Sequence, residues 1–201
     1  PRRTSAPASS CCKMSNVGNV DNAGNAGNGA VKVTSASAIR LDTLTTTGSG
    51  VVGVTTTGGD ITLGNGSGTA INNNGTGALT ITSAANVNVN EAVTHAGAVS
   101  VIANSGAGKI YGDSILTATS SALTLQSDLI GNNTDASSAL GISSASLNIN
   151  AGNAGNGLVK VTSGAAIRLD TLDTTGSGAV SIVTTAGDLT LGDGSATAIN
   201  N

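Results

Sequence analysis

Large aromatic side chains are almost missing from this sequence. Its 201 residues include no Phe, no Trp and one Tyr. A globular core of this length ordinarily uses aromatic side chains to fill the space between layers of secondary structure. The apolar residues here are instead Val, Ile, Leu and Ala, whose small or branched side chains suit a narrow interior. The composition therefore argues against a conventional layered core.

Charged residues are scarce as well. They make up 9% of the chain, and the net charge is −3. The eight Lys and Arg are scattered and form no basic stripe, which argues against nucleic acid as a partner. No apolar run approaches the roughly 18 to 20 residues of a membrane-spanning helix, so we predict no transmembrane segment. Regular alternation of β-branched residues, together with the low net charge, excludes disorder for most of the chain.

Cysteine is confined to the adjacent pair Cys11 and Cys12. A bond between neighbouring cysteines requires a strained ring, and no His lies nearby to complete a metal site. We therefore expect a fold that does not depend on disulfides and that holds no metal and no cofactor. Residues 1–20 differ in composition from the rest, and we predict that they form a disordered leader. Residues 21–201 are predicted to form a single repeat array.

The most informative feature that is present is an internal duplication. Residues 22–73 and 150–201 align without a gap, and 40 of their 52 paired positions are identical. Such self-similarity, at an offset of roughly 128 residues, indicates an array architecture. The chain begins with Pro1 and ends at INN, where the first copy continues with NGTGALTITS. We therefore expect this sequence to be a fragment of a longer protein.

Short runs of apolar, polar and apolar residues recur along the array, as in Val31-Lys32-Val33 and Ile39-Arg40-Leu41. A period of two predicts strands with one buried and one solvent-facing side. Gly-Asn, Gly-Ser and Gly-Asp steps, which favour turns, separate the runs. Equivalent strands recur at intervals of roughly 20–24 residues, which predicts an all-β parallel solenoid with two or three strands in each coil. The offset between the two copies then corresponds to six coils, and the array to eight or nine coils in a rod about 40 Å long.

The alternation also assigns side chains to the two sides of each strand. Val180 is expected to face inward and Lys160 outward. The threonine runs at 45–47 and 55–57 are expected to project from the β surfaces. Asn-rich corners are expected to stack into ladders of side-chain amides along the rod; they include Asn22, Asn25, Asn28 and residues 72–74.

Residues 20–201 resemble a known group of proteins. The pattern V-K-V-T-S-x-x-x-I-R-L-D-T-L-x-T-T-G-S-G-x-V-x-V, followed by G-D-I-T-L or G-D-L-T-L, is similar to the repeats of filamentous-haemagglutinin-like large exoproteins. The resemblance implies a right-handed parallel β-helix that Gram-negative bacteria export by a two-partner or autotransporter route. It also implies a role in adhesion, a secreted or cell-surface location, and an outer-membrane transporter as a partner during export.

Enzymatic activity is the first alternative, because parallel β-helices also host polysaccharide lyases and hydrolases. Such sites need clustered carboxylates and a base. The candidate residues all belong to the duplicated unit, whereas a catalytic cluster normally occurs once. We therefore predict no catalytic residue and explain the acids by turn formation and charge pairing. The candidates are Asp42, Asp60, Asp170 and Asp188, with Arg40 and Arg168.

Calcium binding is the second alternative, because Gly-Asp turns in β-rolls bind this ion. The tandem G-G-x-G-x-D-x-U-x motif is missing, and Gly58-Gly59-Asp60 and Gly192-Asp193-Gly194 are isolated pieces of it. His95 and Tyr111 are single residues of their types. We expect His95 to be exposed or at a coil corner, without partners for a ligand or switch role.

The sequence thus predicts a non-enzymatic exoprotein fragment that acts in adhesion. The expected partners are glycans or proteins of host cells or matrix, or neighbouring bacterial surfaces. Ice binding would need a regular T-x-T rank, and the threonine pairs here are unevenly placed. A structural spacer or S-layer-like protein without a specific ligand remains open, because the predicted exposed faces carry no distinctive patch.

Overall fold

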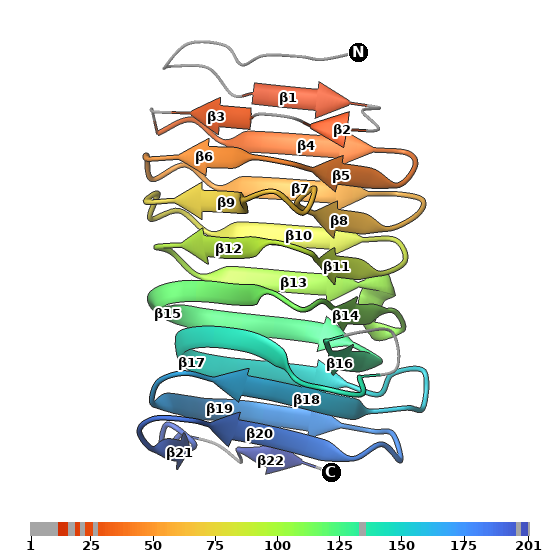
Figure 1. Ribbon diagram of the computed structural model, residues 1–201, viewed down its shortest axis with the longest axis vertical. Helices are drawn as coiled ribbons and strands as arrows, with labels where there is room; N and C mark the ends of the chain where they lie inside the picture. The colour runs from red at the N-terminus through yellow and green to blue at the C-terminus, as the bar shows by residue number, and fades with distance from the viewer. Residues whose placement is uncertain are drawn as a thin grey trace.

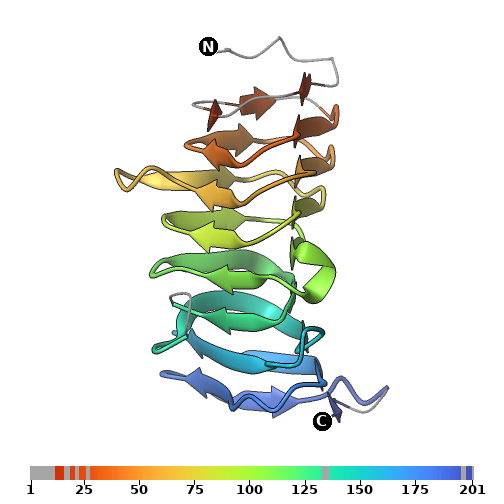
Figure 2. The ribbon, with the colours of Figure 1, turned by 90° about the vertical axis from the view of Figure 1, so that its right-hand side faces the viewer.

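The structure, a computed structural model, is a rod of stacked coils (Figure 1). Strands run across the rod, and each coil lies directly below the preceding one from the N-terminus to the C-terminus (Figures 1 and 2). Its parallel strands form a β-solenoid of about seven turns, which confirms the predicted all-β parallel solenoid. The structure describes residues 12–15, 19–20, 23–25, 28–132, 136–195 and 198–200.

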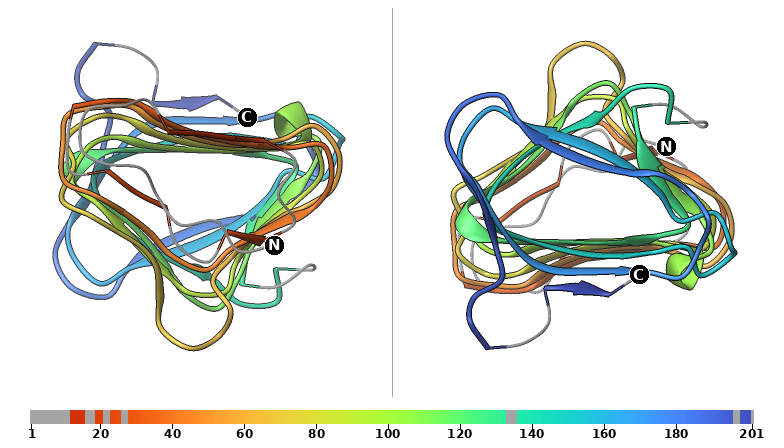
Figure 3. Two further views of the ribbon diagram at one scale, coloured as in Figure 1. Left: turned by 90° about the horizontal axis from the view of Figure 1, so that it is seen from above. Right: turned by 90° about the horizontal axis from the view of Figure 1, so that it is seen from below.

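The strands stack in three columns that form the sides of a roughly triangular cross-section (Figure 3). The first column contains β1 (Cys12–Ser15), β4 (Val31–Ser35), β7 (Val52–Thr56), β10 (Leu79–Ser83), β13 (Val99–Ala103), the second halves of β15 (Ile115–Ser127) and β17 (Leu140–Ala151), then β19 (Ile167–Thr174), β21 (Leu189–Leu191) and β22 (Ile199–Asn200). The second column contains β2 (Asn19–Val20), β5 (Ile39–Leu41), β8 (Ile61–Leu63), β11 (Val87–Val89), β14 (Lys109–Tyr111), β16 (Leu129–Gly131) and the start of β18 (Leu158–Ser163).

The third column contains β3 (Ala23–Asn25), β6 (Leu44–Thr46), β9 (Thr69–Asn73), β12 (Ala92–His95), the first halves of β15 and β17, and the end of β18. Strand β20 (Val180–Thr184) lies below β18, and one short 3-10 helix, η1 (Asn104–Gly106), forms a corner after β13.

The core is built from rows of aliphatic side chains that repeat in register from coil to coil. Parallel pairing places each inward residue directly over its counterpart in the next coil, and the core members of these rows are almost completely buried. One row of the first column consists of Val33, Val54, Ile81, Val101, Leu125, Ile149 and Leu172. Branched side chains of this size fill the lumen without aromatic residues, as the composition predicts.

The number of coils is lower than the sequence predicts. In the first column, the coil that leads from Val52 to Leu79 contains more residues than the preceding coil, because the loop between β8 and β9 lengthens it. Figure 2 shows this loop protruding from the side of the rod. Because its coils are longer than predicted, the structure has about seven coils where eight or nine were predicted. At about 4.8 Å per coil, the rod is about 34 Å long.

The two copies of the duplicated unit lie on different sides of the rod. Five turns lead from Val31 to Leu147 within the first column, and Val159, the counterpart of Val31, lies one side further on in the second column. The prediction that the offset between the copies equals six whole coils is therefore wrong. Residues 64–68 after β8 and residues 192–195 after β21 accordingly protrude from different corners (Figure 3).

The inward and outward assignments need two corrections. Thr46 and Thr56 were expected to project with their neighbours, yet they are buried, because the strands alternate through each threonine run. Val180 pairs in register with Val159, as an inward residue should, but its side chain is 38% exposed. No described strand pairs with the far edge of β20, so its inward side chains are not covered by a further coil.

Two strands lie within residues 1–20, which the composition predicts to be a leader. Strand β1 pairs in parallel with β4, and β2 pairs with β5, so both extend the solenoid by part of a coil. Cys11 and Asn22 lie outside the described residues. Residues 12–15 and 19–20 thus belong to the parallel ladders of the solenoid.

Inward and outward side chains alternate along β13, and this alternation provides a test of the core. We expect Val101→Asp to destabilise the coils around it by about 3–5 kcal/mol, because it places an unpaired carboxylate in an apolar interior. The neighbouring change Ser100→Asp should alter stability by less than about 1 kcal/mol, because the side chain faces outward. Urea unfolding followed by circular dichroism measures both. Equal losses in the two variants would contradict the assignment.

Candidate functional site

The charged residues of the duplicated unit form one ion pair in each copy. In β5 and the corner after it, Nε of Arg40 lies 2.6 Å from Oδ1 of Asp42, and its terminal nitrogen donates to Oδ2 over 3.1 Å. Arg168 and Asp170 make the same two-pronged contact in β19. The hydrogen bond from Arg168 holds the pKa of the Asp170 carboxyl below its usual range, and it raises the pKa of the arginine. Each pair is thus internally neutral.

Asp60 and Asp188 occupy matching turns. Each follows a glycine with positive φ, which is +87° at Gly59 and +84° at Gly187. The backbone carbonyl of each Asp accepts a hydrogen bond from an isoleucine amide in the adjacent coil. The four candidate acids therefore lie in separate ion pairs and turns.

A ladder of side-chain contacts runs along the corner at Asp60. Its Oδ1 accepts hydrogen bonds from both the backbone and the side-chain amide of Asn86, at 2.9 and 3.0 Å. Oδ1 of Asn86 in turn accepts from the backbone amide of Lys109. Burial raises the pKa of the nearby Tyr111, and the negative charge of Asp60 raises it further. Asn86 was not among the residues predicted to form a ladder of side-chain amides. At Asn28, which was, Oδ1 accepts from the backbone amide of Ser49.

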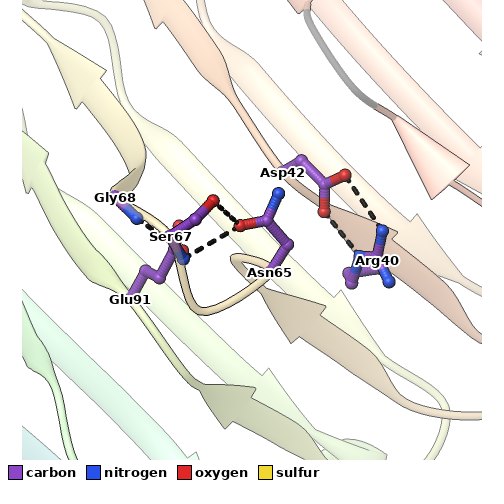
Figure 4. A network of polar contacts seen from close by, with 6 residues as sticks. All are labelled: Arg40, Asp42, Asn65, Ser67, Gly68 and Glu91. Atoms are coloured by element: carbon purple, nitrogen blue, oxygen red, sulfur yellow. Dashed lines mark hydrogen bonds and ion pairs between the residues drawn. The ribbon is translucent and has the colours of Figure 1, made fainter.

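The loop at residues 64–68 is held by a carboxylate from the next coil (Figure 4). Oε1 of Glu91 accepts hydrogen bonds from the backbone amides of Ser67 and Gly68, the second at 2.8 Å. Asn65 closes the loop tip, because its Oδ1 accepts from the backbone amide and the hydroxyl of Ser67. Glu91 is 5% exposed, and a side chain at Gly64 would collide with it. The carboxylate therefore fastens this loop to the rod.

The second copy contains the same kind of loop with a different charge. Asp193 replaces Asn65, and its Oδ1 accepts from both the backbone amide and the hydroxyl of Ser195. These hydrogen bonds lower the pKa of the Asp193 carboxyl. The two loops thus share a turn geometry but differ by one negative charge, and they face different directions.

A groove of about 560 Å³ lies along the outer side of β17, β19 and β22. It follows a register shift between Leu147 and Asn148, where β19 contains one extra residue. Its lining is more apolar than polar, and the polar groups are hydroxyls, amides and one carboxylate. Two contacts join neighbouring coils: Thr171 donates to Asn148 over 2.9 Å, and Asn200 donates to Asp173 over 3.2 Å. Its lining consists of Thr124, Asn148, Ile149, Asn150, Thr171, Leu172, Asp173 and Asn200.

The described residues contain no group of three or more His, Cys, Asp or Glu that could hold a metal ion. Within the same ranges, the search for long apolar helices that could cross a membrane finds none. A scan against protein-family models gives no match, and searches of curated proteins and of solved structures also give none. The resemblance to filamentous-haemagglutinin-like repeats therefore stays a prediction.

Three features of this surface and interior were not foreseen from the sequence. Glu91 is the one glutamate of the chain and stands between two alternating apolar runs, which is a signal that could have marked it. The groove depends on a register shift that no local pattern reveals. His95 was expected to be exposed or at a coil corner; it lies at a corner, at the end of β12, but it is completely buried.

The Glu91 contact predicts a local change in loop stability. We expect Glu91→Ala to raise the hydrogen-exchange rates of the Ser67 and Gly68 amides and to cost about 2–3 kcal/mol, because two hydrogen bonds to a charged acceptor are lost. Glu91→Gln should retain most of the protection, since its carbonyl oxygen still accepts. The amide of Ser195 in the second loop is the internal control. Unchanged exchange at Gly68 in the alanine variant would disprove the contact, because the Ser67 amide also donates to Asn65.

Proposed function

We propose that this protein is a non-enzymatic surface or secreted exoprotein that acts in adhesion, as the resemblance of its repeats implies. The observation that supports this function best is the groove across β17, β19 and β22. It offers hydroxyl, amide and carboxylate groups that complement the hydroxyls of a glycan or the backbone of an extended protein segment. The expected partners are therefore glycans or proteins of host cells, of matrix or of neighbouring bacteria.

The composition of the groove fits weak, repeated binding. It contains no aromatic platform on which a sugar ring could stack, and its polar groups already contact one another between coils. Each contact would then add little, and useful retention would come from many sites that engage together. The duplicated unit adds to this, because its two copies present similar loops at different corners of the rod.

Export by a two-partner or autotransporter route belongs to the same proposal, with an outer-membrane transporter as the partner during secretion. A solenoid suits such export, because each coil needs only its neighbour to fold, so folding can proceed coil by coil as the chain emerges. This part of the proposal rests on the resemblance and on the repeat architecture.

The adhesive role is tested by coupling the chain at high density to inert beads. Bead retention is measured on epithelial cells and on surfaces coated with matrix proteins or glycans. We expect retention above that of beads carrying an inert protein, and a decrease of about tenfold for the variant Asn148→Ala/Thr171→Ala, since two hydrogen-bonding groups are lost.

The matched control is Asn88→Ala/Thr94→Ala, which removes the same two side-chain types from outward positions on the other two columns. Circular dichroism should show that both double variants keep the wild-type fold. Equal loss in the two variants would reject the groove as the binding surface. Wild-type beads that bind no better than the inert control would reject adhesion and favour the alternative of a structural spacer.

A further inference from the structure

Several buried polar side chains lie inside the rod, including Ser35, Thr56 and Ser83 at the end of the first column. A second line of them contains most of the unpaired atoms. It runs along the inner corner at the end of the third column, where successive coils place Asn73, His95, Ala118 and Ser144 in register. Thr46 lies next to Asn73, because its backbone amide donates to Oδ1 of Asn73 over 2.5 Å. We call Thr46, Asn73, His95 and Ser144 the inner polar line. It is independent of the groove and of the proposed adhesive function.

Unpaired polar atoms concentrate on this line. Among the described residues, five buried side-chain atoms have no hydrogen-bond partner, and four of them belong to it. They are Oγ1 of Thr46, Nδ2 of Asn73, Nδ1 of His95 and Oγ of Ser144. Thr46, Asn73 and His95 are 4%, 1% and 0% exposed. Buried polar groups are normally hydrogen-bonded, so four unpaired atoms in one line point to a common partner.

The hydrogen bonds that are present show whether each unpaired atom is a donor or an acceptor. Nε2 of His95 lies 2.6 Å from the carbonyl oxygen of Gly77, an acceptor, so Nε2 carries the proton and Nδ1 is an acceptor. Nδ2 of Asn73 is a donor, because its Oδ1 already accepts from Thr46. Hydroxyl groups at Thr46 and Ser144 can donate or accept. The line therefore alternates between donors and acceptors, as a ligand that does both requires.

Glycines lie against two members of the line. A side chain at Gly75 would bring a carbon to 2.8 Å from Oγ1 of Thr46, and one at Gly97 would lie 3.0 Å from Nε2 of His95. Ala118 separates His95 from Ser144, which are two coils or about 9.6 Å apart. The methyl group of Ala118 has no polar atom, so it can pair with neither of them.

We propose that the inner polar line is a binding site for ordered water, in which water accepts from Asn73 Nδ2 and donates to His95 Nδ1, and that protonation of His95 disrupts this site. Water is the ligand because it is small and both donates and accepts, and buried water typically makes two to four such bonds. An imidazolium has no acceptor at Nδ1, so it would face the amide donor of Asn73 with a second donor.

Among the described residues, no group on the neighbouring elements compensates a charge on His95. The residues that face it are Asn73 on β9, Ala118 on β15, and Gly77 and Gly97 in the adjoining corners, and none of these is titratable or charged. Burial accordingly lowers the pKa of His95, and the hydrogen bond to Gly77 opposes this only in part. The imidazole is thus held neutral in the folded rod.

The sign of the pH effect follows from this direction. The unfolded chain binds the proton with a pKa near 6.5, and the folded chain binds it only at lower pH. The stability that neutral His95 contributes is therefore fully present above about pH 6.5. It falls as the pH drops below that value, until the pKa of His95 in the folded chain is reached. Each unit of difference between the two pKa values raises the unfolding equilibrium constant about tenfold.

The first experiment is a crystal structure at atomic resolution at pH 8. We expect water within hydrogen-bonding distance of both Asn73 Nδ2 and His95 Nδ1. A direct contact between these two atoms, or a dry line, would overturn the water site. His95→Asn should retain the water, because its Oδ1 can replace Nδ1 as the acceptor, whereas His95→Phe should lose it.

The second experiment follows hydrogen exchange at pH 8 and pH 5 for the amide of Ala96, which donates to the carbonyl of Asn73. The wild type should lose about tenfold more protection than His95→Asn between these two pH values, after correction for intrinsic exchange. The amide of Thr185, which makes the same kind of contact to Ser163 in a coil without histidine, is the control. Equal pH dependence in wild type and His95→Asn would overturn the role of His95.

Discussion

The in-register parallel ladder between coils is the interaction on which the rest of this structure depends. It stacks each inward aliphatic residue on its counterpart one coil below, as in the row from Val33 to Leu172. A slip of one residue would turn every such side chain toward water. Full burial of one Val, Leu or Ile contributes about 1.5–3 kcal/mol, so a slipped strand would lose several of these contributions together.

Polar chemistry enters the structure where that ladder is interrupted. The loop at residues 64–68 leaves the rod between β8 and β9, and the backbone amides that it frees are taken up by Glu91. The register shift at Asn148 opens the groove on the outer surface. On the inner side, the corner that contains His95 brings unpaired polar atoms into the lumen. The regular coils supply stability, and the irregular positions supply the candidate sites.

The duplicated unit shows how far local sequence determines local structure. The segment I-R-L-D-T-L forms two short strands around a corner at β5 and β6 in the first copy, and one continuous strand, β19, in the second. In both copies the arginine pairs with the following aspartate. The coils above also differ: β5 lies below β2 and β6 below β3, whereas β19 lies below β17. Nearly the same residues therefore follow two different paths in different surroundings.

The sequence by itself determined the strands, the inward faces and the parallel stacking, because the alternation within each strand and the regular recurrence of strands along the chain are both visible in the order of residues. It also marked the Gly-Asp turns at Asp60 and Asp188. Only the tertiary structure decided the length of each coil, the side of the rod on which each copy lies, and the burial of Thr46 and His95. These depend on the register between coils, which is set by contacts among residues one full coil apart. Each loop or bulge shifts the register of every later coil along the rod.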